Sequence, residues 1–402
     1  MKKILIVALC FITLSLSAQN TRPEKIQSFV DVTWKSDKYE SLEKQWKKLV
    51  SKDKKDAEAW ENYYLAAMFK YKASLFYNDS TPKGSREDLH NIMLKMGKSI
   101  PNTYEYNKLM YRDHDLDHKY GNFIEKAYEI NPNRIDLYPL LITYYETIRD
   151  TAKEAEVFRK WYQTDKNYEA FKLSYGYNMI IAVDKNAIIL SSGDNQFYPA
   201  ATIKFGKNIR TDVDIVGQSM FFANTYYSNL MKSLNMPPFN KTFDDYEKEY
   251  PDNFRKAYRT MALDLIQHII DHADERPVYF PIGMQDYVIE HFKDSLYMVG
   301  VLYQYSSTPF DNYAVLKKNF EQKLYLDNLR VDLKPVADNS VKYRLQTIYL
   351  TPLSELYKHY LLSGDLGKAN NTRNLILKLA DDYGRRDSYL EYLNKVEKEY
   401  NN

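Results

Sequence analysis

The chain has 402 residues, with 56 Lys and Arg against 54 Asp and Glu and a formal net charge of +2 at pH 7. This balance offers no general attraction for nucleic acid or anionic lipid, which excludes binding driven by a basic surface. The single cysteine excludes a disulfide scaffold and a thiolate zinc site. Twelve glycines and 38 tyrosines argue against glycine-rich nucleotide loops and favour helices that pack tyrosine rings inward.

The first residues have the pattern of a secretory signal peptide. Lys2 and Lys3 precede the apolar residues 4–16, a run of signal-peptide length that is short for a membrane span. Small residues follow, and we expect cleavage after Ala18, leaving a periplasmic or secreted chain with no membrane span. A lipoprotein signal that uses Cys10 is the alternative, although Leu9 is bulky for the position before a lipidated cysteine.

Residues 38–78 are expected to form a helical hairpin. Leu42 and Trp46 recur at helical spacing before a polar connection, and Trp60 and Tyr64 do so after it. A loop follows at residues 79–85, and Ser85 is placed to cap a helix that ends before Ile100.

The clearest repeat signal lies in residues 123–164. Two apolar-faced helices are predicted on either side of the break Asn131-Pro132-Asn133, and a third follows with small residues such as Ala152 and Ala155. This pattern resembles a tetratricopeptide repeat, in which stacked helix pairs bury faces that one pair cannot bury alone. A similar helix–turn–helix pattern, with its turn at residues 363–365, runs through the C-terminal region.

The central region changes to strand-like patterns. Residues 187–190, 213–216 and 277–280 are short apolar or β-branched runs, and residues 297–305 are expected to form a fourth strand. The amphipathic helix predicted at residues 254–273 separates two of these runs. Strands that alternate with helices indicate a mainly parallel sheet. The predicted fold class is therefore α-rich α/β, with tetratricopeptide-like repeats that flank a small α/β unit.

Three motifs in this region resemble a known family. Residues 192–199 (SGDNQFYP), 210–213 (RTDV) and 276–280 (RPVYF) are similar, in order and rough spacing, to motifs in Bacteroidetes membrane proteins related to protein O-mannosyltransferases. Their soluble C-terminal part carries the motifs, and the agreement covers about residues 178–385. The resemblance implies an exported α/β unit with trailing helical repeats. Ser192 and Gln196 depart from the family's motif, and the membrane-spanning region is missing, so no residue of a sugar-transfer site is carried over.

The turn Gly193-Asp194-Asn195 is the main candidate site. It follows a predicted strand, at the sheet edge where ligands of parallel sheets bind. Asp194 and Asn195 could contact a sugar hydroxyl, a ribose or a cation, and Arg210 is the predicted partner of Asp194. The alternative is structural: glycine supplies a positive φ, and Asp or Asn caps the next helix.

Other candidate sites are weaker. His114, Asp117 and His118 belong to the densest group of potential metal ligands, although the pattern lacks the glycine and the final glutamate of a calcium loop. His268 and His272 share a face of the amphipathic helix and are expected at the boundary with solvent. Ser80 lies in an Asp-Ser-Thr sequence typical of O-glycosylated exported Bacteroidetes proteins.

The sequence predicts four parts: a signal peptide at residues 1–18, helical repeats at 19–177, an α/β unit at 178–310 and helical repeats at 311–402. No hydrolase, metalloprotease or P-loop motif occurs, and no cofactor is implied. The leading hypothesis is therefore a non-catalytic interaction protein of the bacterial envelope with a protein or peptide partner. The alternative is a carbohydrate-linked enzyme or ligand-binding protein that uses the strand end near Asp194.

Overall fold

The computed structural model of the protein describes residues 22–27, 34–77, 79, 81–114, 116–165, 170–251, 253–330 and 345–400. The predicted signal peptide with its cleavage site after Ala18, Cys10 and Ser80 lie outside these residues. The chain divides into an N-terminal unit, Met1–Asp115 with Asn122–Ile130, and a main unit, Leu116–Gly121 with Asn131–Asn402. Helices predominate and a small mixed sheet accompanies them, which confirms the α-rich α/β class.

All regular secondary structure described in the N-terminal unit is helical. The predicted hairpin is confirmed as α2 (Ser36–Lys52) and α3 (Ala57–Phe76), and Ser85 caps α4 by accepting a hydrogen bond from the Asp88 amide. Trp46 of α2 is fully buried, and fully buried alanines of α3 such as Ala59 let the two helices approach closely. The other helices are α4 (Arg86–Ser99), α5 (Tyr104–Asp113) and α6 (Gly121–Ile130).

The main unit contains one five-stranded sheet with the order β2-β1-β3-β5-β4. Strand β1 pairs in parallel with both β2 and β3, whereas β5 pairs antiparallel with β3 and β4. The sheet is thus mixed, and only its first half has the predicted parallel arrangement. Its strands are β1 (Ile188–Ser191), β2 (Asp214–Gly217), β3 (Val278–Pro281), β4 (Leu296–Met298) and β5 (Leu302–Tyr305).

The prediction of one strand at residues 297–305 is wrong. The segment forms the hairpin β4–β5, closed by a 3.0 Å hydrogen bond from the Val299 amide to the Leu302 carbonyl. Gly300, with φ 157, lies in this turn. The sequence pattern did not indicate this tight turn, because the turn residues Val299 and Val301 are apolar and fully buried like the strand residues around them.

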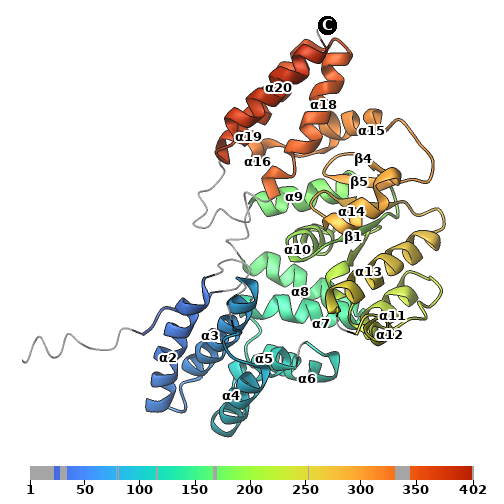
Figure 1. The fold of residues 1–402 in the computed structure, drawn as a ribbon. Coiled ribbons are helices and arrows are strands. Elements are labelled where there is room, and N and C mark those ends of the chain that lie inside the picture. Colours follow the sequence, from blue (N-terminus) through green and yellow to red (C-terminus); the bar gives the residue numbers. More distant parts are fainter. Residues whose placement is uncertain are drawn as a thin grey trace, which may run out of the picture. The chain divides into compact units, whose positions relative to one another are not determined.

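Helices cover both faces of the sheet (Figure 1). Ile188 and Leu190 pack into a core with α11 and α13, and Ile189, which alternates with them, points to the opposite face. The helices on the first face are α11 (Asn224–Ser233), α12 (Phe243–Glu249), α13 (Phe254–Asp271) and α14 (Asp286–Phe292). Those that precede β1 or connect it to β2 are α7 (Tyr138–Ile148), α8 (Thr151–Thr164), α9 (Ala170–Ile181), α10 (Asp194–Ala201) and the π-helix η3 (Thr202–Gly206).

The C-terminal helices belong to the main unit. Asn178 of α9 is fully buried and holds the segments around them to α9, since its amide donates to the Tyr349 hydroxyl at 2.7 Å and to the Tyr325 carbonyl at 2.8 Å. The helices are α15 (Asn312–Lys318), the π-helix η6 (Asn319–Lys323), α16 (Asp327–Arg330), α18 (Leu350–Leu362), α19 (Leu366–Asp382) and α20 (Arg386–Tyr400). Short 3-10 helices are η1 (His118–Tyr120), η2 (Ile135–Leu137), η4 (Gln218–Met220) and η5 (Lys293–Ser295).

Residues 123–164, which have the clearest repeat pattern, are helical as predicted, but their helices belong to two different compact units. Helix α6 belongs almost wholly to the N-terminal unit, whereas α7 and α8 belong to the main unit. There α7 packs on α8 and α11, and α8 packs on η3. Among the described helices, none is both long enough and apolar enough to span a membrane.

Candidate functional site

The predicted partners Asp194 and Arg210 lie at opposite edges of the sheet. Asp194 follows β1, so it is at the carboxyl end of the parallel strands. Arg210 precedes β2, which runs parallel to β1, and its partners precede β1, so it is at the amino end. The structure therefore does not bring the two residues into one site.

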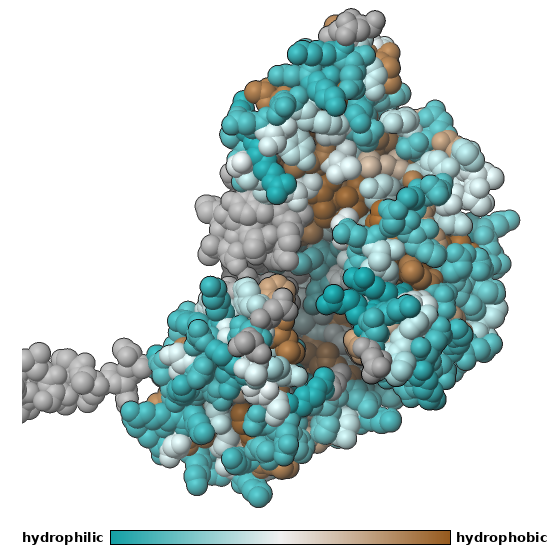
Figure 2. Space-filling model, viewed as in Figure 1, coloured by the Kyte–Doolittle hydropathy of each residue, from teal (hydrophilic) through white to brown (hydrophobic). Residues whose placement is uncertain are grey.

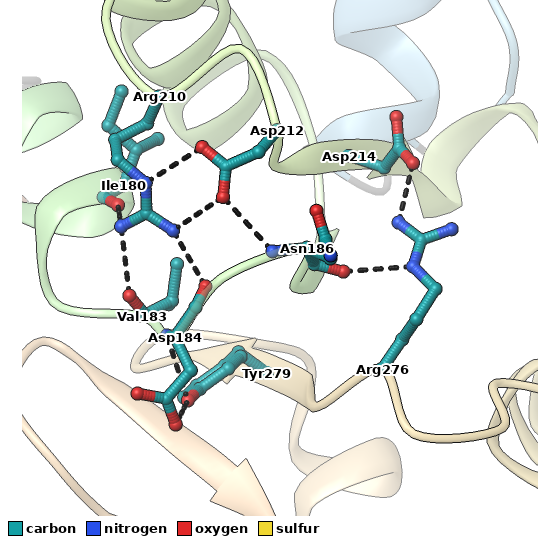
Figure 3. A network of polar contacts seen from close by, with 9 residues as sticks. All are labelled: Ile180, Val183, Asp184, Asn186, Arg210, Asp212, Asp214, Arg276 and Tyr279. Carbon is teal, nitrogen blue, oxygen red and sulfur yellow. Dashed lines mark hydrogen bonds and ion pairs between the residues drawn. The ribbon is translucent and has the colours of Figure 1, made fainter.

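Arg210 is a structural clamp (Figure 3). Its guanidinium forms a two-point ion pair with Asp212, with both N–O distances 2.9 Å. It also donates to the carbonyl groups of Ile180, Val183 and Asp184 at 3.0, 2.9 and 2.6 Å. The hydrogen bond from Arg210 keeps the pKa of the Asp212 carboxyl far below its usual range. All five N–H donors of the guanidinium group therefore have acceptors within the protein.

A second arginine continues this network across the amino edge. Arg276 donates to the Asn186 carbonyl at 2.8 Å and to Asp214 at 2.5 Å (Figure 3). The Asn186 amide in turn donates to Asp212 at 3.0 Å. Two of the three family-like motifs, RTDV and RPVYF, thus supply residues that hold the loop before β1. Their role in this chain is structural.

The third motif lies at the carboxyl edge, where Gly193 and Asp194 begin α10. Gly193 has an extended backbone with φ 171, so the expectation of a positive φ is wrong, and a Cβ there would meet no atom within 4 Å. Asp194 does not cap α10 through its side chain; it occupies the first turn, where a negative charge is favourable. Its side chain reaches solvent on one side, while the surrounding protein desolvates the rest and raises the pKa of its carboxyl. Asn195 follows it and is half-buried.

Gln196, the departure from the family's acidic motif, has a structural role. It is buried, accepts a hydrogen bond from the Ser192 amide at 2.7 Å and donates one to the Ile282 carbonyl at 3.4 Å. A carboxylate at this position could accept the first bond but could not donate the second. The amide side chain therefore joins the ends of β1 and β3.

The structure adds three polar residues to the carboxyl edge that sequence reasoning missed. Gln218 follows β2 and is fully buried, and Gln285 and Tyr287 follow β3. Gln218 donates to the Tyr287 hydroxyl at 2.8 Å, and Gln285 donates to the Ser192 carbonyl at 3.4 Å. The sequence could have identified them, because each residue comes shortly after a predicted parallel strand, and the carboxyl ends of parallel strands meet at one edge of the sheet.

The histidine candidates do not form a metal site among the described residues, where no three His, Cys, Asp or Glu side chains gather suitably. His114 belongs to the N-terminal unit, whereas Asp117 and His118 belong to the main unit and pair with each other at 3.1 Å. His268 and His272 lie with their ring centroids 4.3 Å apart and their planes tilted by 39°, and each contacts a backbone carbonyl. These contacts give both rings a structural role at the end of α13.

No protein-family model and no curated protein sequence matches the chain. We therefore infer its function from its residues and their geometry.

Proposed function

We propose that this chain is an exported, non-catalytic interaction protein of the bacterial envelope, with tetratricopeptide-like helical hairpins that hold a protein or peptide partner. The observation that carries this proposal is that consecutive antiparallel helices occur at both ends of the chain. Near the N-terminus α2 packs on α3, and near the C-terminus α19 packs on both α18 and α20. Stacked hairpins of this kind present a row of side chains for partner binding.

The C-terminal helices supply a specific candidate surface. Leu362 and Leu366 flank the turn between α18 and α19 and are 66% and 62% exposed. Figure 2 shows a mainly hydrophilic surface with small hydrophobic patches, including some on these helices. Two exposed leucines beside a turn form a small apolar surface, and they give a defined position at which to test partner binding.

Two sequence features support the export part of this proposal. The N-terminus has the charge, length and small-residue pattern of a signal peptide. The three family-like motifs also link the main unit to proteins whose soluble part is exported. The use of Arg210 in a structural clamp removes the side chain on which an enzymatic role near Asp194 depended.

Affinity purification from periplasmic and outer-membrane extracts tests this role. The tagged wild-type chain is expected to retain a reproducible partner, and the double variant Leu362→Asp/Leu366→Asp is expected to lose it. A matched control, Asp387→Asn on α20, changes an exposed residue and should retain the partner. Failure to recover any partner from either extract, or equal recovery with the double variant at full folding, would count against this function.

A second candidate function is ligand binding at the carboxyl edge of the sheet. The specific observation in its favour is that the side-chain oxygens of Gln218 and Gln285 are buried without hydrogen-bond partners among the described residues. The alternative of a carbohydrate-linked enzyme depended on Asp194 and Arg210 sharing the strand-end site, and Arg210 lies at the opposite edge of the sheet.

A further inference from the structure

Charge is distributed unevenly along the α2–α3 hairpin of the N-terminal unit. In the first part of α2 opposite charges are paired, as in the 2.7 Å ion pair between Lys44 and Glu40. From residue 45 to residue 55 the only carboxylate is that of Asp53. The end of α2 and the loop that follows it are therefore rich in lysine.

Lysines gather where α2 ends, α3 begins and α4 ends. The Lys55 ammonium donates a hydrogen bond to the Ser99 carbonyl at 2.6 Å, which joins the α2–α3 loop to the last turn of α4. Seven lysines around this bond are exposed, and none of them forms an ion pair with a carboxylate of the described residues. This lysine end consists of Lys47, Lys48 and Lys52 of α2, Lys54 and Lys55 of the loop, and Lys95 and Lys98 of α4.

Neighbouring carboxylates do not neutralise the lysine end. Asp56 and Glu58, at the start of α3, pair with Arg22 at 2.8 and 2.7 Å. The side chain of Asp53 accepts a hydrogen bond from the Lys55 amide at 2.8 Å and is the one acidic group that remains. The near neutrality of the whole chain therefore does not exclude binding driven by this local basic surface.

Local structure accounts for three of the seven lysines. Lys52 and Lys98 lie in the last turns of α2 and α4, where a cation interacts favourably with the helix dipole. Lys55 binds the Ser99 carbonyl. The other four have no such role, and like charges that are crowded on one surface repel one another. An anionic partner would offset this repulsion.

We propose that the lysine end of the N-terminal unit binds the surface of a membrane that contains anionic phospholipids. This inference goes beyond the interaction role and does not depend on it. All seven cations are lysines, whose ammonium groups on flexible chains suit mobile headgroups, whereas a planar guanidinium suits one phosphate held in a fixed geometry.

The arrangement of the lysine end favours a membrane over a bound acidic segment. Its lysines are spread over two helix ends and a loop, and all are exposed, so they can contact an extended surface together. Leu94, which precedes Lys95 on α4, is 52% exposed and adds an apolar side chain that can enter the headgroup region.

Vesicle sedimentation tests the proposal on the chain that begins at Gln19, because the apolar signal peptide would itself bind lipid. Phosphatidylcholine vesicles are compared with vesicles that also contain about 30% phosphatidylglycerol. We expect at least about tenfold tighter binding to the anionic vesicles, because each lysine near such a surface strengthens partitioning by about fivefold. Binding should weaken between about 0.05 and 0.5 M salt, since the Debye length shortens.

Two variants of the lysine end make the test specific. Lys48→Gln/Lys52→Gln/Lys54→Gln removes three charges and keeps the bond between Lys55 and Ser99, so it should fold like the wild type by circular dichroism. Its binding to anionic vesicles should be about a hundredfold weaker. The independent variant Lys95→Gln/Lys98→Gln should bind about 25-fold more weakly, and it replaces the first variant if that variant fails to fold.

The matched control is Lys185→Gln/Lys232→Gln/Lys395→Gln, which removes three charges from exposed positions of the main unit and should bind nearly as the wild type does. Equal binding to both kinds of vesicle, an equal loss in the control, or unchanged binding by the folded lysine-end variants would overturn the proposal. Binding to soluble polyglutamate but not to anionic vesicles would also overturn it and would indicate an acidic protein partner. None of these outcomes affects the affinity-purification test, which depends on Leu362 and Leu366.

Discussion

At the scale of single residues, the amino edge of the sheet shows how one arginine can organise a loop. Arg210 donates to three carbonyl groups and to both oxygens of Asp212. The carbonyls belong to the end of α9 and the loop that precedes β1, where backbone acceptors would otherwise need water. Arg210 also adopts a φ of 52°, a strained conformation for a non-glycine residue that its contacts hold in place.

Arg210→Lys should lower the free energy of unfolding by about 2–3 kcal/mol, because an ammonium group cannot replace a planar donor that serves several acceptors. Urea unfolding followed by circular dichroism measures this change. Arg255→Lys, at an exposed position of α13, is the matched control and should change stability by less than about 0.5 kcal/mol. Similar stability of the two variants would show that the clamp contributes little.

At the scale of elements, buried acidic residues join the α7–α8 hairpin to the rest of the main unit. Glu146 of α7 accepts a hydrogen bond from the Tyr226 hydroxyl of α11 at 3.1 Å and pairs with Arg149. Glu154 of α8 is buried and shares a hydrogen bond with Glu146. Burial, followed by the charge of Glu146, raises the pKa of Glu154, although Arg149 and Lys204 oppose the shift. Glu154 therefore keeps its proton above the usual glutamate range.

This arrangement predicts that stability falls as the pH rises. Because the folded-state pKa of Glu154 is raised, the folded chain binds more protons than the unfolded chain between the two pKa values. The loss in this interval amounts to at most about 1.4 kcal/mol per pH unit. Glu154→Gln, which is neutral at every pH, should remove that slope in urea unfolding at acidic, neutral and alkaline pH. The exposed neighbour variant Glu156→Gln should retain it; equal slopes for both variants would contradict the prediction.

The crossing of α9 and α10 sets the position of the carboxyl-edge site. A Cβ on Gly176 of α9 would lie 2.2 Å from the Pro199 carbonyl oxygen of α10. The helices can pack so closely only because Gly176 has no side chain. This contact holds in place the helix whose first residue is Asp194.

Gly176→Ala is therefore expected to destabilise the chain by about 3 kcal/mol or more, because backbone has to move to admit the methyl group. Gly367→Ala on α19 is the matched control. Gly367 is exposed, and a Cβ there would come no closer than 3.9 Å to a neighbouring side chain. The gain in helix propensity should stabilise this variant by about 0.5–1 kcal/mol. Thermal unfolding of both variants tests whether the sign of the change differs.

At the scale of the whole molecule, local patterns in the sequence predicted the helices and most strands. The hairpin at residues 38–78, the helix at 254–273 and three strands are confirmed because periodicity and caps act within a few residues. The division of the predicted repeat between two compact units depends on long-range packing that periodicity does not record.

The site was predicted only in part, for a related reason. Asp194 was found because it directly follows a strand. Pairing it with Arg210 required knowledge of strand direction at both positions, and the parallel pairing of β1 and β2 separates them. Gln218 and Gln285 carry no motif; only their positions after neighbouring strands and their unpartnered oxygens identify them.

The proposed export of the whole chain can be tested by changing single residues near its N-terminus. The predicted cleavage after Ala18 removes Lys2 and Lys3 and leaves equal numbers of basic and acidic residues. Intact mass spectrometry of the protein from an envelope fraction should therefore give a chain that begins at Gln19. Ala18→Tyr should block processing, because signal peptidase requires a small residue before the cleaved bond. Cys10→Ser should leave both the cleavage site and the mass of the mature chain unchanged, because residue 10 is removed with the signal peptide. A lipidated chain that begins at residue 10 would instead establish the lipoprotein alternative.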